Sequence, residues 1–384
     1  MKKIIFVTAS RADYGKLKNL IINLQKNKKY KVYVFVTGMH NLKKFGSTWM
    51  KIKLNKYDNI KNVIRFNNQS SNDPTDITFA KTIFGFTKIV KKIRPDLIIV
   101  HGDRIEPLAC ASVGALNNFK IGHIEGGEVT GTVDEILRHS ISKLSHIHFT
   151  TNHKAKKRLI QMGELAANIF VIGSPDIDIM RSKSLPTLKE VKKHYNINFN
   201  EYAIAVLHSV TTDIVNFKNY TKIFVKSLLN SKKNFVVIYP NNDYGSNIIF
   251  REYQNLKKHK NIRMLPSMNF EHYLTLLKNS NFIIGNSSSG IMEAPYFGVP
   301  TINIGNRQNK RSALKTINNI NFQQKKIIKL INYFFKNKVR HPKKYEFGNG
   351  KSFKLFETIL NSGKIWKVSP QKTFKELKLN YRSK

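Results

Sequence analysis

Short apolar runs alternate with amphipathic segments along the first half of the chain. Continuous hydrophobic runs predict buried strands, and apolar residues recurring every three to four positions predict helices. The predicted strands are residues 2–7, 32–36, 96–100, 120–124, 147–150 and 169–172. The predicted helices are residues 14–25, 79–93, 106–117, 134–145 and 154–162. This alternation is typical of βαβ units, which build a parallel sheet covered by helices.

The same alternation restarts after a turn-like cluster, Gly-Ser-Pro-Asp at residues 173–176, and a basic segment that extends to residue 200. Strands are predicted at residues 202–207, 234–239, 262–265, 282–284 and 301–304. Helices are predicted at residues 219–229, 246–256, 270–277, 289–297, 324–335 and 352–360. We therefore expect an α/β protein with two Rossmann-like domains, residues 1–174 and 175–350, and a cleft between them. Residues 351–384 are expected to form a C-terminal helix and tail.

Composition places the chain among globular proteins. It has 384 residues, 41% of them apolar, and no apolar run approaches the roughly 20 residues that span a bilayer. The apolar run at residues 4–7 is too short for the core of a signal peptide. Cys110 is the one cysteine, so an internal disulfide is excluded. It lies in an apolar stretch and is expected to be a buried thiol in a protein of the reducing cytoplasm.

The formal net charge of +42 raises the possibility of nucleic-acid binding. Lysine is spread along the whole chain among many asparagines and isoleucines, however, and no recognition helix or aromatic RNA-binding motif stands out. We therefore expect no nucleic-acid partner. Anionic small molecules should still be attracted.

Three carboxylates follow predicted strands or open the next helix. Asp103 stands in His-Gly-Asp-Arg after the strand at 96–100, and Glu125 stands in His-Ile-Glu-Gly-Gly-Glu after the strand at 120–124. Asp134 begins the following helix. The carboxyl ends of parallel strands converge on one crevice, where binding sites form. Several acids there predict proton transfer in an enzyme.

Two helix starts are candidates for phosphate binding. Arg11 and Lys16 lie between the first strand and helix, where backbone amides and the helix dipole favour anions. In the second half, Gly-Asn-Ser-Ser-Ser-Gly at 285–290 includes Ser287 and Ser288 before a helix that carries Glu293. Neither segment has a dinucleotide or Walker motif, so ordinary helix caps remain an alternative.

Other polar residues lie at strand ends of the second half. His208, Asn241 and Arg307 follow the strands at 202–207, 234–239 and 301–304. The remaining histidines near residue 140, namely His139, His146 and His148, are expected to be packing or surface residues, and no spacing resembles a zinc site. Asp134 and Arg138 are four residues apart and could form a helix surface pair.

Together these motifs resemble the UDP-N-acetylglucosamine 2-epimerase family, in particular its hydrolysing branch. The resemblance extends over about residues 1–362 in consistent order. It is carried by Arg-Ala-Asp-Tyr at 11–14, His-Gly-Asp-Arg at 101–104, His-Ile-Glu-Gly-Gly-Glu at 123–128, Gly-Thr-Val-Asp at 131–134, Arg-His at 138–139, Gly-Asn-Ser-Ser at 285–288 and Arg-Gln at 307–308.

The resemblance implies a glycosyltransferase B type fold, with the UDP-sugar in the cleft and the C-terminal helix crossing back to the first domain. It implies loss of UDP to give a 2-acetamidoglycal, followed by addition of water, with no cofactor or metal. Asp103, Glu125 and Asp134 would be the catalytic acids. Arg11, Lys16, Arg104 and His208 would stabilise the departing diphosphate, and Asn241, Ser287, Ser288, Glu293 and Arg307 would bind the nucleotide. Relatives commonly self-associate, so a homo-oligomer is expected.

Four alternatives to hydrolysis of UDP-N-acetylglucosamine remain open on the sequence. The first is the same chemistry on a UDP-2,4-diacetamido-2,4,6-trideoxyhexose. The second is the non-hydrolysing epimerase, and the third is a glycosyltransferase with the same fold. The fourth is a protein that binds UDP-sugars or polyanions without catalysis. A pocket around C4 and C6 of the sugar would separate the substrates, and the sequence does not locate it.

Overall fold

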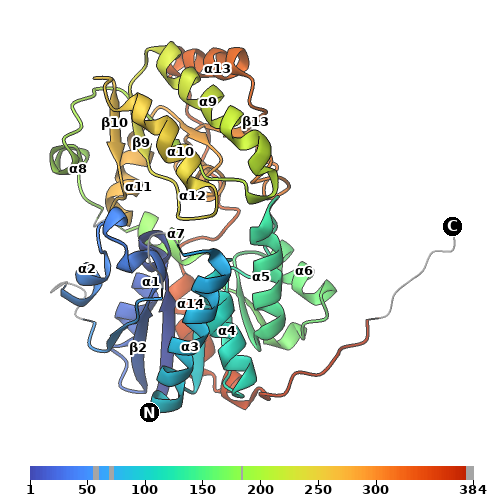
Figure 1. Cartoon of the computed structure of the whole chain (residues 1–384). Coiled ribbons are helices and arrows are strands. Elements are labelled where there is room, and N and C mark those ends of the chain that lie inside the picture. Colours follow the sequence, from blue (N-terminus) through green and yellow to red (C-terminus); the bar gives the residue numbers. More distant parts are fainter. Residues whose placement is uncertain (55–59, 69–72, 183–184, 378–384) are drawn as a thin grey trace.

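The structure is a computed structural model that describes residues 1–54, 60–68, 73–182 and 185–377. It has two lobes, each built on a parallel β-sheet, one above the other in Figure 1. The first lobe contains seven strands in the order β3-β2-β1-β4-β5-β6-β7. These are β1 (Lys2–Thr8), β2 (Tyr30–Val36), β3 (Val63–Arg65), β4 (Leu97–His101), β5 (Ile121–Ile124), β6 (Ile147–Thr150) and β7 (Ile169–Val171).

Helices cover both faces of the first sheet (Figure 1). They are α1 (Arg11–Leu24), α2 (Trp49–Leu54), α3 (Thr75–Ile93), α4 (Ile105–Leu116), α5 (Val133–Leu144) and α6 (His153–Gln161). Short 3₁₀ turns are η1 (Gly38–Asn41), η2 (Lys43–Phe45) and η3 (Ala166–Asn168). Helix α7 (Pro175–Met180) follows the last strand and lies between the two lobes.

The second lobe contains six strands in the order β10-β9-β8-β11-β12-β13. These are β8 (Ala203–Val206), β9 (Phe235–Ile238), β10 (Ile262–Leu265), β11 (Ile283–Gly285), β12 (Thr301–Ile304) and β13 (Ile317–Ile320). Its helices and 3₁₀ turns are α8 (Leu188–Tyr195), η4 (Thr211–Asp213), α9 (Ile214–Ser231), α10 (Ser246–Tyr253), η5 (Gln254–Leu256), α11 (Phe270–Asn279), α12 (Ser289–Tyr296) and α13 (Gln324–Asn337). The predicted pair of parallel α/β sheets is confirmed.

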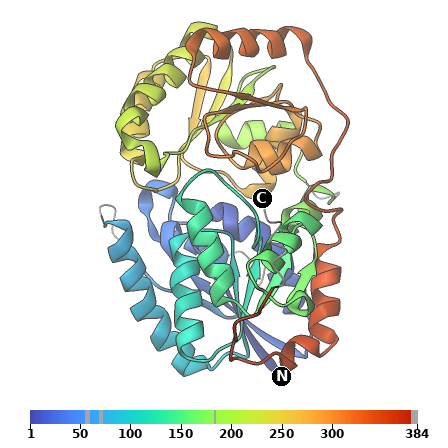
Figure 2. The same ribbon diagram turned by 90° about the vertical axis from the view of Figure 1, so that its right-hand side faces the viewer.

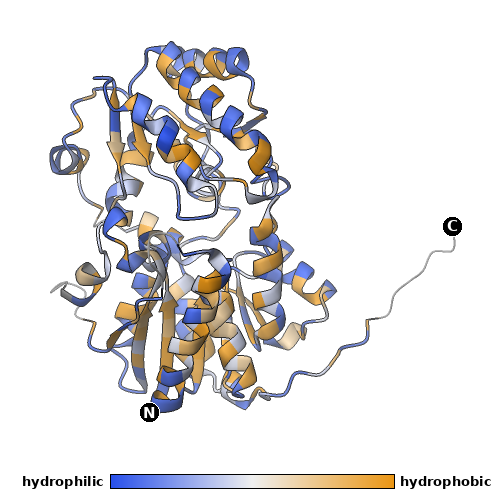
Figure 3. Ribbon diagram, in the orientation of Figure 1, coloured by the Kyte–Doolittle hydropathy of each residue, from blue (hydrophilic) through white to orange (hydrophobic). Residues whose placement is uncertain are grey.

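The strands form the core because both faces of each sheet are covered. Side chains alternate along β1: Ile4 and Phe6 pack under α1, whereas Ile5 and Val7 pack under α3, α4 and α5. All four are fully buried, and each such side chain stabilises the fold by about 1.5–3 kcal/mol. Figure 3 shows the apolar colour concentrated on the strands. Continuous hydrophobic runs are therefore what these strands require.

The chain returns to the first lobe after completing the second. Helix α14 (Ser352–Asn361) and the turn η6 (Lys364–Lys367) pack beside the first sheet (Figure 2). The Phe356 ring lies 4.8 Å from the Phe149 ring, centroid to centroid, and belongs to the same core as Ile4. Asp178 of α7 accepts the backbone N–H groups of Ser352 and Phe353 at 2.9 and 2.8 Å. This carboxylate caps the start of α14, so the predicted crossing back to the first domain is confirmed.

The prediction of a turn at residues 173–176 was wrong in its second half. Gly173 does turn, with a φ of 83°, but Pro175 and Asp176 begin α7. Proline suits the first position of a helix because its missing N–H would have no partner there. Helix α8 was also missed, within the segment interpreted only as basic; a capping box of Thr187 and Glu190 starts it.

Among the described residues, no helix is long and apolar enough to cross a membrane. Cys110 is fully buried on α4, as the sequence predicted for its thiol.

Candidate active site

A cavity of about 350 Å³ lies between the two lobes. Its lining includes segments after β1, β2, β4 and β5 in the first lobe and after β8, β9, β10, β11 and β12 in the second. All twelve site residues predicted from the sequence line it, namely Arg11, Lys16, Asp103, Arg104, Glu125, Asp134, His208, Asn241, Ser287, Ser288, Glu293 and Arg307. The structure therefore brings the predicted residues together, and their roles stay predictions.

Glu125 lies at the end of β5 among groups that favour its charged form. Lys16 Nζ is 3.3 Å from its Oε1, His101 Nε2 is 3.4 Å from its Oε2, and the Ser174 hydroxyl donates to Oε1 at 2.5 Å. Burial alone would raise the pKa of Glu125, but Lys16 and His101 hold it well below its ordinary value. This carboxylate is therefore ionised in the resting site.

Lys16 pairs with carboxylates in this structure. Its Nζ lies 3.3 Å from Glu125, 3.6 Å from Asp176 and 3.9 Å from Glu293. Burial opposes the charged form, but the three acids raise the pKa of Lys16 above its usual range. The ammonium is the countercharge of a buried acid cluster, whereas the sequence analysis expected it beside a diphosphate.

Glu293 lies on α12, one side of the same cluster, and is 3% exposed. Burial raises the pKa of Glu293; Lys16 lowers it and Asp176 raises it, and the resulting value is about 7. Because this pKa is near neutral, Glu293 can hold or release a proton around pH 7. Asp176, which the sequence analysis did not single out, is fully buried on α7.

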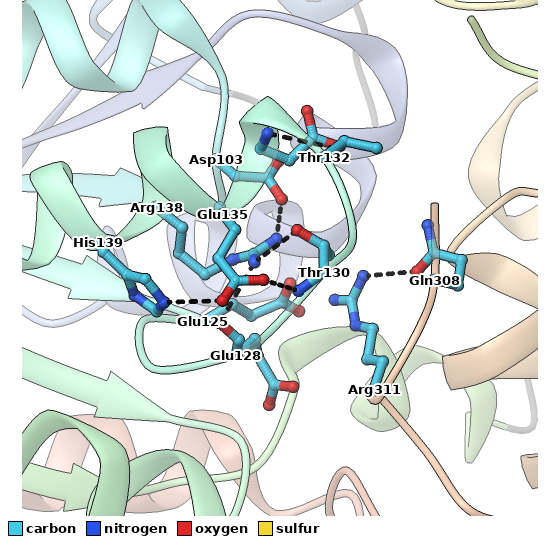
Figure 4. A network of polar contacts seen from close by, with 12 residues as sticks. Asp103, Glu125, Glu128, Thr130, Thr132, Glu135, Arg138, His139, Gln308 and Arg311 are labelled. Carbon is cyan, nitrogen blue, oxygen red and sulfur yellow. Dashed lines mark hydrogen bonds and ion pairs between the residues drawn. The ribbon is translucent and has the colours of Figure 1, made fainter. Parts of the chain in front are cut away.

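Asp103 and Asp134 are each paired with an arginine (Figure 4 shows the first pair). Arg138 Nη2, on α5, donates to Asp103 Oδ2, and Arg307 Nη2 donates to Asp134 Oδ2 at 2.8 Å. The pair of Asp134 with Arg138 that the helix spacing allowed is not formed, because Arg138 is 1% exposed and turns into the lobe. The second pair joins the two lobes.

Arg104 also crosses between the lobes. Its Nη2 donates to Asn242 Oδ1 at 2.6 Å, and its Nη1 lies 3.4 Å from Asp243 Oδ1, both after β9. Burial works against the charge, but Asp243 and Glu106 raise the pKa of Arg104. A permanent cation therefore stands at the cavity where both lobes meet.

His208 is held as a neutral hydrogen-bond donor. The backbone N–H of Asn241 donates to its Nδ1 at 3.1 Å, so the ring carries its proton on Nε2. Burial, together with Arg307, lowers the pKa of His208 to about 3. The Asn286 side chain accepts from His208 N–H at 2.7 Å and donates to its carbonyl at 2.9 Å, which fixes this strand end.

The loop before α12 depends on a glycine at residue 285. Gly285 has a φ of 133°, and a Cβ there would lie 1.9 Å from the Val206 carbonyl oxygen. The chain therefore turns tightly out of β11 and presents Ser287 and Ser288 to the cavity. Hydroxyl groups at a helix start are suited to an anionic oxygen.

The site thus combines three kinds of group. Two carboxylates are held by arginines, a third contacts an imidazole and an ammonium, and a serine loop with nearby cations faces them across the cavity. Among the described ranges, no cluster of three or more His, Cys, Asp or Glu side chains could hold a metal ion. The arrangement is suited to proton transfer at a carbon next to an anionic leaving group.

Comparison with known protein families identifies the chain. The family model described as UDP-N-acetylglucosamine 2-epimerase matches residues 22–361, most of the sequence. The chain belongs to the UDP-N-acetylglucosamine 2-epimerase family. The resemblance inferred from the motifs is confirmed, and the protein is an enzyme of that family.

Relatives of this epimerase match along its whole length. A UDP-N-acetylglucosamine 2-epimerase of Neisseria meningitidis serogroup B is 40% identical over 381 residues, covering 99% of this chain and 100% of the relative. A UDP-N,N'-diacetylbacillosamine 2-epimerase (hydrolyzing) of Legionella pneumophila is 31% identical, with 94% and 96% covered.

Solved structures confirm the fold of the epimerase. A UDP-GlcNAc 2-epimerase from Neisseria meningitidis, bound to UDP-GlcNAc, has a TM-score of 0.79 at 20% identity, covering 94% of this chain and 100% of that one. The Methanocaldococcus jannaschii UDP-GlcNAc 2-epimerase, in complex with UDP-GlcNAc and UDP, has a TM-score of 0.77 at 21% identity, with the same coverage.

Sequence reasoning missed several groups of the epimerase site. Asp13 and His101 stand in motifs that the resemblance quoted, but no role was assigned to them. Their signal was position alone: His101 ends β4, the strand next to that of Glu125, and Asp13 follows β1, the strand on the other side of β4. Histidines 139, 146 and 148 lie outside the cavity lining, in agreement with the packing or surface role expected for them.

Three buried histidines of the epimerase predict acid sensitivity. Burial is the main cause that lowers the pKa of His40 to about 4 and of His123 and His208 to about 3. Below pH 6.5 the unfolded chain binds protons that the folded chain does not, so the free energy of unfolding falls as pH falls. Each histidine contributes up to about 1.4 kcal/mol per pH unit.

Urea unfolding at pH 7 and pH 5 measures this loss. His40→Gln should reduce the difference in the free energy of unfolding between pH 7 and pH 5. His153→Gln, at an exposed position on α6, should leave that difference unchanged. Equal differences in all three proteins would contradict the assignment.

Proposed function

We propose that the protein is a hydrolysing UDP-N-acetylglucosamine 2-epimerase, which converts UDP-N-acetylglucosamine and water to N-acetylmannosamine and UDP. The observation that carries the proposal is the meeting of Asp103, Glu125 and Asp134 in one cavity opposite the serine loop of α12. The full-length similarity to the Neisseria epimerase supports it.

In the proposed first step, UDP leaves C1 while a carboxylate removes the proton from C2, which forms a 2-acetamidoglycal. Negative charge develops on the diphosphate, so cations and hydrogen-bond donors aimed at it lower the barrier. Arg104 supplies a permanent charge and His208 a neutral N–H, while Ser287 and Ser288 offer hydroxyl groups. Arg11, Asn241 and Arg307 complete the proposed nucleotide contacts.

Lys16 and Glu293 need a change of partner to take their proposed roles. Lys16 would contact the diphosphate and Glu293 the ribose hydroxyls, yet in this structure they lie 3.9 Å apart. Nucleotide binding would compete with that contact. Glu293 can accept a hydrogen bond from a ribose hydroxyl group whether or not it carries a proton itself.

The substrate has one specific alternative. The Legionella relative is named for UDP-N,N'-diacetylbacillosamine, and a 32% identical Campylobacter jejuni relative for GDP/UDP-N,N'-diacetylbacillosamine. The same carboxylates would serve a 2,4-diacetamido-2,4,6-trideoxy sugar, since the chemistry at C1 and C2 is unchanged.

Proton NMR of the purified protein with UDP-N-acetylglucosamine in D₂O tests the proposal. We expect free N-acetylmannosamine, deuterated at C2, to appear together with UDP. If only the diacetamido sugar is turned over, that sugar is the substrate and the proposed mechanism still holds. UDP-N-acetylmannosamine as product would assign the non-hydrolysing reaction, and no reaction with either sugar would overturn the proposal.

Two further properties are proposed from the composition and from the family resemblance. A single cysteine that is fully buried suits the reducing cytoplasm. A homo-oligomer is proposed from the family resemblance, and light scattering of the purified protein would measure its mass.

A further inference from the structure

Three titratable side chains form a line across neighbouring strands of the first sheet. Asp13 lies in the first turn of α1 after β1, His101 ends β4, and Glu125 follows β5. These strands are adjacent, in the order β1-β4-β5, so their carboxyl ends meet. His101 Nδ1 is 2.9 Å from Asp13 Oδ1, and its Nε2 is 3.4 Å from Glu125 Oε2. One imidazole therefore bridges two carboxylates.

Both ends of this line are fixed by the backbone. Asp13 Oδ2 accepts the N–H of Ala9 at 2.9 Å, and the Asp13 N–H donates to the Ser10 hydroxyl at 3.2 Å, so the helix start orients the side chain. Glu125 has a φ of 65°, a left-handed conformation that is strained for a residue other than glycine. Such strain gathers at functional sites, where the surrounding structure maintains it.

The three proposed catalytic acids differ in the side chain that each of them contacts. Asp103 and Asp134 are backed by Arg138 and Arg307, and a guanidinium does not release a proton in proteins. These two arginines therefore cannot supply a proton to the carboxylates that they contact. Glu125 contacts the imidazole of His101, which can release a proton and take one up.

Among the described residues, three side chains that carry a proton contact Glu125, namely Ser174, Lys16 and His101. The Ser174 hydroxyl is a very weak acid, and the acids around Lys16 hold its ammonium in the charged form. His101 is the neighbour that can give up a proton and recover it. Solvent is a poor direct source, because the Glu125 side chain is 5% exposed.

We propose that Asp13, His101 and Glu125 form a proton relay that returns a proton to C2 of the 2-acetamidoglycal. The inference rests on the proposed function and deepens it. The Glu125 carboxyl gives a proton to C2, whose new C–H bond takes the electron pair of the C1–C2 double bond. Glu125 receives that proton from His101. Water bonds to C1 and loses a proton, which returns to His101. The proton taken from C2 in the first step is released by the carboxylate that removed it.

His101 and Asp13 act through Glu125, so both are positioning residues. Burial would lower the pKa of His101, but Glu125 and Asp13 raise it to about 9. The relay therefore carries its proton below about pH 9 and loses it above. Other charged or titratable groups that act on members of this line are His40, Arg104, Glu106, His123, Lys16, Glu128 and Glu293.

The test separates elimination from hydration. NMR of the full chain with UDP-N-acetylglucosamine quantifies UDP, N-acetylmannosamine and released 2-acetamidoglycal. In His101→Gln we expect UDP release to continue and the ratio of glycal to N-acetylmannosamine to rise about a hundredfold or more. His123→Gln is the matched control: His123 is fully buried on the next strand and neutral, and its replacement should leave that ratio unchanged.

A second variant keeps the His101 side chain and lowers its pKa. Asp13→Asn removes a charge that raises the pKa of His101, so the pH above which glycal appears should shift from about 9 to a lower value. An unchanged glycal ratio in His101→Gln, or equal loss of UDP and N-acetylmannosamine without glycal, would overturn the relay. An unshifted pH profile in Asp13→Asn would also overturn the relay. This second measurement tests the relay even if His101→Gln does not fold. Failure of the unaltered protein to release UDP would instead contradict the proposed function.

Discussion

Asp103→Asn is expected to lower kcat for UDP-N-acetylglucosamine by about a hundredfold or more, the scale of a general acid–base group. The Asp103 carboxylate lines the cavity and is held in place by the buried Arg138, so it is placed to accept a proton. Asparagine keeps the shape and cannot act as a base. Because elimination itself would fail, neither UDP nor glycal should appear, in contrast to His101→Gln.

The measurement needs a folded variant and a matched control. Arg138 would lose its anionic partner, and we expect the free energy of unfolding to fall by about 1–3 kcal/mol. Thermal unfolding and UDP binding by calorimetry would show that the protein is intact. Glu135→Gln, one residue beyond Asp134 and outside the cavity lining, should keep normal turnover. Turnover of Asp103→Asn within a few-fold of that control would exclude Asp103 as a catalytic acid.

Phe356→Ala is expected to lower the free energy of unfolding by about 3–5 kcal/mol. Phe356 is fully buried on α14, and its ring lies 4.8 Å from that of Phe149 and 6.3 Å from that of Phe6. Alanine would leave a cavity between the returning helix and the sheet, in a core that neighbouring elements already fill. Urea unfolding followed by circular dichroism measures the change.

Leu355→Ala supplies the comparison for that result. Leu355 is the preceding residue of the same helix and is 40% exposed. Its replacement should change the free energy of unfolding by less than about 0.5 kcal/mol, as at other surface positions. Similar losses in both variants would mean that α14 contributes through its own helical stability, with no special role for the Phe356 contact.

The fold was predictable where hydrophobic runs are long. Residues 97–100 of β4 are an unbroken apolar run with both faces covered, and such strands were found within a residue or two. Strand β13, with two asparagines between its isoleucines, was missed because it lies at the edge of its sheet and needs little apolar surface. Strand β3 was also missed, because it is short, lies at the edge of the other sheet and is only partly buried. The domain limits at residues 174 and 350 stay predictions.

The cavity residues were predictable because parallel strands deliver their carboxyl ends to one place. Partners across the fold were not. Sequence spacing suggested Asp134 with Arg138, but the lobes bring Arg307 to Asp134 and leave Arg138 to Asp103. Asp176 was hidden in a segment interpreted as a turn. Pairings of this kind depend on how two lobes and a linking helix pack, which local patterns do not encode.

The return of α14 also sets the order in which the lobes can be completed during synthesis. The Tyr30 hydroxyl donates to Asn361 Oδ1 at 2.8 Å, although the two residues are 331 positions apart. At ribosomal speed, those residues take roughly 15–65 seconds to make. Until Phe356 is made, the space that it fills beside Phe6 and Phe149 stays open, although the last strand of the second lobe, β13, is complete at Ile320. The lobe that emerges first from the ribosome is therefore the last to complete its core.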